Sequence, residues 1–239
     1  MKLKKDFFDH LIELRSVFFK AFLLLFIFLL ILLPFSNEIY HFFAQPLIDK
    51  FLLYEGELIS TNLTATFFVP LKITAYSALV MGLPLMLIPF WSFMSPGLYP
   101  KEKKFILWAM VFAFILFLAA AFFVYMLVFP LIFEFFIRMK PDDVRLMIDI
   151  SSYLEMIISL FIAFGLAFQI PLLVIGLAKF NLISTSKLKA YRSYVLVFAF
   201  IFGAIFTPPD VISQLLLAIP VYLLYEVGIM FAKNSKKRI

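Results

Sequence analysis

Long uninterrupted apolar runs constrain this chain more than any other feature of its sequence. Residues 21–33 contain no charged or polar side chain, and several comparable runs follow. The chain is 64% hydrophobic and 15% charged, whereas a soluble domain is under about half apolar and roughly a quarter charged. Because so much apolar surface cannot be hidden inside 239 residues, we predict an all-α integral membrane protein with one membrane domain, residues 1–239.

The apolar runs predict six transmembrane helices, of which the fifth and sixth are expected to be short. Their expected ranges are 17–35, 65–90, 105–129, 152–178, 194–206 and 211–232. Residues 2–20 have helical spacing of apolar residues and predict a basic interfacial helix that continues into the first span. No small-residue cleavage pattern follows that span, so we expect an uncleaved anchor. Residues 36–64 and 130–150 mix polar and apolar residues and predict helical caps on the far face, the first broken at Pro46.

Positive charge predicts how the helices are oriented. Of the 21 Lys and Arg residues, sixteen lie on the same side as the N-terminus. Cytoplasmic loops carry this excess, so we expect both termini in the cytoplasm and the protein in the plasma (inner) membrane. The net charge of +6 is then a signal of topology and of contact with the lipid bilayer, and we expect no nucleic-acid partner.

Residue types missing from the sequence exclude several kinds of site. There is no Cys and there are only two His, so we expect no metal, no cofactor and no catalytic residue. An intramembrane enzyme is disfavoured, because the spans lack paired carboxylates and the motifs of nucleophilic or zinc hydrolases. A small-solute or ion transporter is the main alternative function. Against it, the spans lack a series of acidic and His residues and show no inverted repeat; transport by the purified chain alone would support it.

Two acidic residues lie among the basic residues of the predicted cytoplasmic side, Glu13 before the first span and Glu102 before the third. In the ordinary interpretation, Glu102 favours the positive end of its helix and Glu13 pairs with Arg15 or Lys20 at the surface. In the sharper interpretation, both lie near one groove and bind guanidinium groups, whose planar fork meets a carboxylate with two hydrogen bonds.

Polar residues at three other places predict local structure. Ser152 and Glu155 fit a capping box at the start of the fourth span. Thr207 can cap the sixth helix, with Asp210 near its positive end. Gln169 lies deep in the fourth span, where an amide needs a hydrogen-bond partner. That partner is either another helix of the bundle or a helix of a partner protein that occupies a lipid-facing groove.

Several segments, in order along nearly the whole chain, resemble the TatC family, the receptor subunit of the twin-arginine protein translocase. The segment His10-Leu11-Ile12-Glu13-Leu14-Arg15 resembles the family's signature before the first span. The other matching segments are Ala44-Gln45-Pro46-Leu47, Trp91 and Phe93 with Pro96-Gly97-Leu98-Tyr99 and Glu102, residues 164–171, and Thr207-Pro208-Pro209-Asp210-Val211 with Gln214 and Ala218-Ile219-Pro220. Each motif is weak alone, but five in register are specific.

The resemblance implies a receptor that binds signal peptides with consecutive arginines and works with the single-span subunits TatA and TatB in a multi-copy complex. Folded proteins then cross the membrane, driven by the proton gradient. The implied signal-peptide residues are Glu13, Glu102, Phe93, His10, Leu14 and Arg15. The implied structural or partner-facing residues are Gln169, Pro46, Asp210 and Gln214. Many relatives carry Glu at the position of Gln169, so a proton-transfer role there is in doubt.

Overall fold

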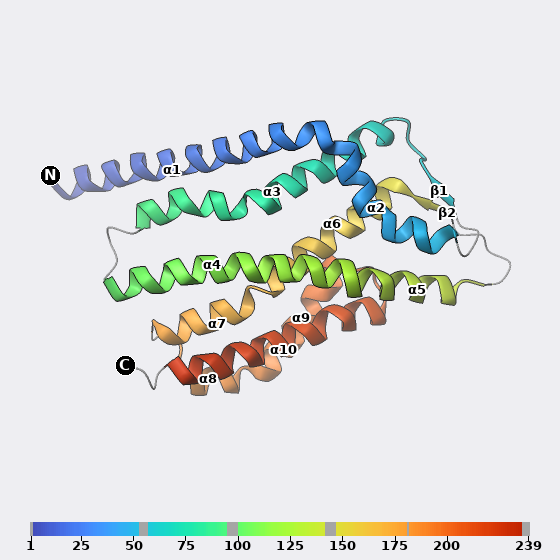
Figure 1. The fold of residues 1–239 in the computed structure, drawn as a ribbon. Coiled ribbons are helices and arrows are strands. Elements are labelled where there is room, and N and C mark those ends of the chain that lie inside the picture. The colour runs from blue at the N-terminus through green and yellow to red at the C-terminus, as the bar shows by residue number, and fades with distance from the viewer. Residues whose placement is uncertain (1, 53–56, 95–99, 142–146, 181, 236–239) are drawn as a thin grey trace. The chain divides into compact units, whose positions relative to one another are not determined.

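The computed structural model describes residues 2–52, 57–94, 100–141, 147–180 and 182–235, and within these it describes the side chains of a smaller set. The described chain is almost entirely helical (Figure 1). It forms two compact units: unit 1 is Met1–Phe43 with Thr66–Phe114, and unit 2 is Ala44–Ala65 with Ile115–Ile239. The predicted all-α fold class is confirmed.

Unit 1 is built from the first helices of the chain. They are α1 (Lys2–Leu32), a 3-10 turn at Leu33–Phe35, the first part of α2 (Ser36–Leu52), α3 (Ala65–Met94) and the first part of α4 (Pro100–Phe123). The 31 residues of α1 span about 46 Å at 1.5 Å per residue, so one helix contains both the predicted basic lead and the first span. Helices α3 and α1 lie in contact at Gly82, where a Cβ would lie 3.7 Å from Leu25 Cδ1, an ordinary van der Waals distance.

Unit 2 contains the remaining elements. They are a π-helical turn (Val124–Val128), α5 (Phe129–Met139), α6 (Ile150–Ala167), α7 (Ile170–Lys179), α8 (Thr185–Ala190), α9 (Arg192–Phe206), α10 (Val211–Ser235), and the strands β1 (Glu57–Ile59) and β2 (Met147–Asp149). The strands pair in parallel, with Leu58 opposite Ile148. This pairing was not predicted, because three-residue strands leave no periodicity to detect.

The far-face segments differ from their predicted form in two places. Helix α2 continues through Pro46, although a break was expected there. Residues 130–139 continue the third span as α5, where a separate cap was expected. Pro130 is tolerated because it lies in the first turn of α5, where its missing N–H has no intrahelical partner to lose. The π-helical turn precedes it, with the Phe129 N–H bonded to the Val124 carbonyl.

Five described helical stretches are long and apolar enough to cross a membrane: Leu14–Pro46, Ala65–Gly82, Lys104–Met139, Ile150–Lys179 and Val211–Ala232. The remaining predicted span, the fifth, corresponds to the apolar helix α9, whose 15 residues cover about 22 Å, less than a roughly 30 Å hydrocarbon core. The fifth span is therefore short, as predicted. The sixth is not: α10 has 25 residues and spans about 37 Å.

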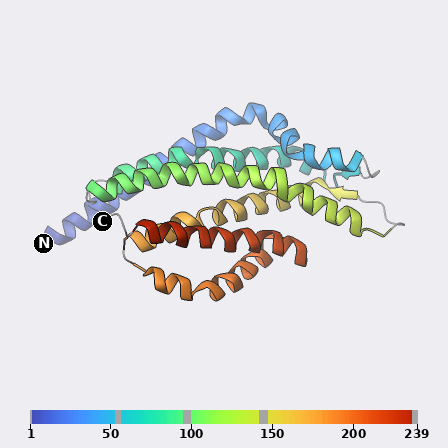
Figure 2. The same cartoon turned by 60° about the horizontal axis from the view of Figure 1, so that its bottom comes forward.

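Helices α7 and α10 pack closely within unit 2, which Figure 2 shows from a second side. A Cβ at Gly228 of α10 would lie 2.9 Å from Val174 Cβ and 3.0 Å from Pro171 Cα, both in α7. A glycine is therefore required at position 228 for the two backbones to approach this closely. On the same side of α7, Val174 and Ala178 join Tyr225, Ile229 and Leu188 in a buried apolar cluster.

Candidate functional site

The three segments with the predicted signal-peptide residues lie at one end of unit 1. Glu13 lies in α1, Phe93 near the end of α3, and Glu102 near the start of α4. Because α3 runs opposite to α1 and α4, the beginning of α1, the end of α3 and the beginning of α4 lie at the same end of the unit in both views (Figures 1 and 2). The fold therefore brings together segments that are about ninety residues apart in the sequence.

Individual side chains at this end are described only in part. Leu14 is half-buried and Arg15 is exposed. The side chains of His10, Glu13, Phe93 and Glu102 lie outside the described residues, so the direction of both carboxylates stays a prediction. We call this end of unit 1, formed by residues 10–15 of α1, 91–94 of α3 and 100–104 of α4, the candidate receptor face. Its sequence contains acidic residues among many Lys and Arg. The acidic residues attract a cationic ligand and the basic residues around them repel it, so a cation is directed to the acidic positions.

Gln169 lies at a break in the fourth span. Helix α6 ends at Ala167 and α7 begins at Ile170, so the predicted single helix is two helices in series. The break is caused by Pro171, which lacks a backbone N–H to donate to the preceding turn and fits the first turn of a new helix. Gln169 occupies the N-cap position of α7 without capping it through its side chain, and it is half-buried. Both predicted roles for its amide remain open.

The turn between α9 and α10 is held by a different set of hydrogen bonds from the predicted one. Asp210 Oδ1 accepts from the Ser213 N–H at 2.7 Å, so Asp210 is the residue that caps α10. Thr207 instead closes the end of α9, since its Oγ1 donates to the Gly203 carbonyl at 2.9 Å. The prediction that Thr207 caps α10 was wrong, because the hydroxyl reaches back to the Gly203 carbonyl, which also accepts the Thr207 N–H at 2.8 Å. Gln214 is half-buried, and its backbone lies 3.5 Å from where a Cβ would project at Gly203.

Asp149 is a structural residue that sequence reasoning missed. It caps α6 by accepting from the Ser152 N–H at 3.4 Å, and it also accepts from the N–H and Oγ1 of Thr61, each at 3.0 Å. The Thr61 N–H is the main cause that holds the pKa of the Asp149 carboxyl below its usual range, and its hydroxyl acts in the same direction. The predicted capping box at Ser152 and Glu155 was wrong, because the Asp149 carboxylate one turn earlier is the acceptor.

An ion pair between α9 and α10 was also missed. Arg192 Nη2 donates to Glu226 Oε2 at 2.5 Å. The two residues are 34 positions apart, so no local spacing could reveal that they meet. Pro46, the remaining predicted structural residue, is half-buried within α2. Among the described residues, no cluster of three or more His, Cys, Asp or Glu has the arrangement of a metal site.

Comparison with known proteins gives this arrangement a family. Residues 9–220 match the family model described as Sec-independent protein translocase protein (TatC). The Haemophilus influenzae protein of that name is 40% identical over 224 residues, which cover 94% of this chain and 87% of the relative. The corresponding Escherichia coli K12 protein is 39% identical over 225 residues, covering 94% of this chain and 86% of the relative.

A solved structure agrees with the sequence relatives. The crystal structure of a twin-arginine translocase receptor, TatC, superposes with a TM-score of 0.82 and 31% sequence identity, covering 95% of this chain and 99% of that chain. Family, relatives and fold all agree with the sequence motifs. They identify a non-enzymatic, multi-pass membrane component of a protein translocase. The chain belongs to the TatC family of Sec-independent protein translocase proteins.

Proposed function

We propose that this protein is the signal-peptide receptor of its translocase and that the candidate receptor face binds the consecutive arginines of twin-arginine signal peptides. The observation that carries the proposal is that the beginning of α1, the end of α3 and the beginning of α4, which contain Glu13, Phe93 and Glu102, lie at the same end of unit 1. In this arrangement the carboxylates receive the guanidinium groups, and Phe93 supplies an apolar wall beside them. The solved relative's description as a twin-arginine translocase receptor supports the same role.

We further propose the membrane, the orientation, the partners and the energy source of this receptor. Sixteen of the 21 Lys and Arg residues lie on the N-terminal side, which favours cytoplasmic termini in the inner membrane, where an unexported cargo protein first meets the receptor. The partners are TatA and TatB, which assemble with several copies of this chain, and the energy source is the proton gradient. The long exposed apolar surfaces of the helices suit both lipid and partner helices.

The recognition chemistry is tested by exchanging the two arginines of a signal peptide for lysines. Lysine keeps the charge but loses the planar fork that forms paired hydrogen bonds with a carboxylate. We expect the purified protein in detergent to bind the Lys-Lys peptide with an affinity lower by a factor of about ten or more than that for the Arg-Arg peptide. This factor corresponds to the loss of one charge-assisted hydrogen bond. Fluorescence anisotropy of labelled peptides measures this, with a Gln-Gln peptide as the uncharged reference. Equal affinities for the Arg-Arg and Lys-Lys peptides contradict the proposed site.

A further inference from the structure

The short helix α8 lies at the surface of the membrane. It joins α7, which completes the fourth span at Lys179, to α9, which begins the fifth at Arg192. A six-residue helix between the ends of two membrane-spanning helices lies at the level of the lipid headgroups. The flanking residues fit that depth, since Tyr191 and Tyr194 are 46% and 72% exposed and tyrosines concentrate at membrane–water interfaces.

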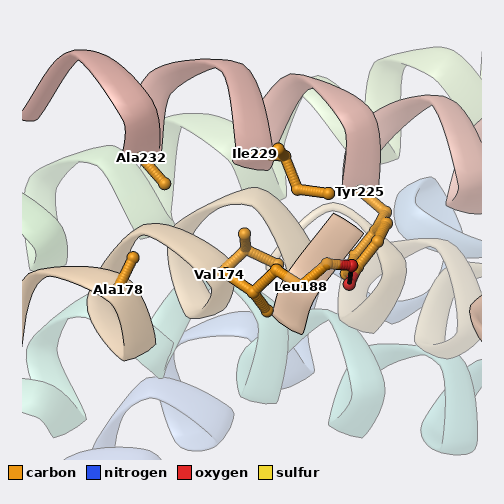
Figure 3. Close-up of a cluster of buried hydrophobic side chains, with 6 residues drawn as sticks. All are labelled: Val174, Ala178, Leu188, Tyr225, Ile229 and Ala232. Carbon is orange, nitrogen blue, oxygen red and sulfur yellow. Dashed lines mark hydrogen bonds between the residues drawn. The ribbon is translucent and has the colours of Figure 1, made fainter. Parts of the chain in front are cut away.

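Helix α8 is fixed to the helices beneath it. Leu188 is buried against Val174, Ala178, Tyr225 and Ile229 of α7 and α10 (Figure 3). The Tyr225 hydroxyl donates to the Leu188 carbonyl at 2.7 Å. Ser184 caps the helix by accepting from the Lys187 N–H at 3.3 Å. The side of α8 that carries Leu188 is therefore anchored to α7 and α10, and the remaining side chains of the helix project away from that side.

Two lysines flank this anchor. Lys187 and Lys189 are the direct neighbours of Leu188, so they project to either side of the buried face, at about 100° from it. Both are exposed. Within the described part of the chain, neither ammonium group forms an ion pair, and the sequence contains no Asp or Glu between Glu155 and Asp210. The acid that the fold brings to this end of α9, Glu226, is occupied by Arg192 at 2.5 Å.

We propose that α8 binds the phosphate groups of anionic phospholipids, with Lys187 and Lys189 each contacting a phosphate on its own side of the helix and the Tyr191 and Tyr194 rings at the level of the glycerol backbone. Uncompensated cations at headgroup depth match a lipid phosphate in both charge and position. The anchoring of α8 through Leu188 and Tyr225 fixes the backbone that carries the two lysines, so the helix itself does not have to be ordered on binding. The residues of this site belong to unit 2, whereas those of the candidate receptor face belong to unit 1.

Native mass spectrometry of the purified full chain tests the site with phosphatidylglycerol and phosphatidylcholine of identical acyl chains. We expect the unaltered protein to retain phosphatidylglycerol preferentially. The Lys187→Gln/Lys189→Gln variant is expected to lose about tenfold or more in affinity for phosphatidylglycerol, since each lysine near an anionic surface contributes separately, and to bind phosphatidylcholine unchanged. Should this variant fail to fold, Lys189→Gln alone is expected to show about half of the loss on a logarithmic scale.

Two controls separate the site from general effects of charge. Lys187→Arg/Lys189→Arg keeps both charges and is expected to keep the preference. Lys20→Gln/Lys72→Gln removes two charges from exposed positions in unit 1 and is expected to keep it as well. Equal retention of the two lipids by the unaltered protein, or an undiminished preference in the double Gln variant, overturns the proposal. Displacement of phosphatidylglycerol by millimolar inorganic phosphate or by an acidic peptide also overturns it, because the ligand is then not a lipid.

Discussion

Glu102→Lys is expected to weaken the binding of a twin-arginine signal peptide by about tenfold or more, without unfolding the protein. A charge-assisted hydrogen bond contributes roughly 1.5–3 kcal/mol, and about 1.4 kcal/mol corresponds to a factor of ten. The substitution removes this bond and places a repelling cation beside the peptide's arginines, so the loss exceeds that of simple truncation. Glu13→Ala is expected to act in the same direction with a smaller effect. Titration with a labelled peptide in detergent measures both variants.

Glu38→Lys is the matched control for this experiment. Glu38 occupies the same place in α2 (Ser36–Leu52) as Glu102 does in α4 (Pro100–Phe123), the third residue of its helix. Glu38→Lys makes the same charge reversal at an exposed residue of unit 1, but it lies away from the candidate receptor face, at the opposite end of α1. We expect Glu38→Lys to bind the peptide like the unaltered protein. Equal weakening by both substitutions would mean that the effect is not specific to the receptor face.

Gly228→Leu is expected to destabilise the protein strongly by separating α7 from α10. Even the first atom of the new side chain would lie 2.9 Å from Val174 Cβ, 3.0 Å from Pro171 Cα and 3.2 Å from the Pro171 carbonyl oxygen. Two of these atoms belong to the backbone of α7, so rotation of a side chain cannot relieve the overlap. Overpacking of this kind costs about 1–3 kcal/mol and sometimes more. Thermal unfolding in detergent, followed by circular dichroism, measures the loss.

Substitutions at two other glycines are expected to destabilise the protein less than Gly228→Leu, in proportion to the space around each glycine. A Cβ at Gly176 of α7 would meet nothing within 4 Å, whereas one at Gly165 of α6 would lie 2.7 Å from the Cε2 atom of the Phe117 ring. Because the ring can rotate away, Gly165→Leu should destabilise less than Gly228→Leu. Gly176→Ala should be neutral or stabilising by up to about 1 kcal/mol, the gain in helix propensity. A Gly228→Leu protein as stable as Gly176→Ala would refute the close packing of α7 on α10.

The helical architecture could be predicted because each span depends mainly on its own residues. An apolar run such as 21–33 must form its backbone hydrogen bonds internally in lipid, and only a helix of sufficient length does this. Helix α3 begins at Ala65 and helix α9 ends at Phe206, next to the polar residues that interrupt the apolar runs. The local sequence, however, offers two possible caps at the start of α6 and of α10, and it does not show which one forms. In the structure Asp149 caps α6 in place of Ser152, and Asp210 caps α10 in place of Thr207.

The features that were not predicted depend on residues distant in the sequence. The pairing of β1 with β2, the bonds from Thr61 to Asp149 and the ion pair of Arg192 with Glu226 each join residues at least 34 positions apart. No alternation or helical spacing reports such a contact. The candidate receptor face was predicted in part from the sequence and depends in part on the fold. Its acidic residues were selected from the sequence by their unusual surroundings and by the family motifs, while the placement of the ends of α1, α3 and α4 on one side of unit 1 required the fold.

Site-specific photocrosslinking of a twin-arginine signal peptide tests the receptor face most directly. A photoreactive amino acid is placed in turn at positions 10–15 and 91–104, and at Leu63, Leu118 and Val211 as exposed controls elsewhere on the chain. We expect the peptide to crosslink to both of the first two segments, and the crosslinks to disappear when its arginines are replaced by glutamine. Crosslinking only at the control positions, or equally with and without the arginines, would contradict the account.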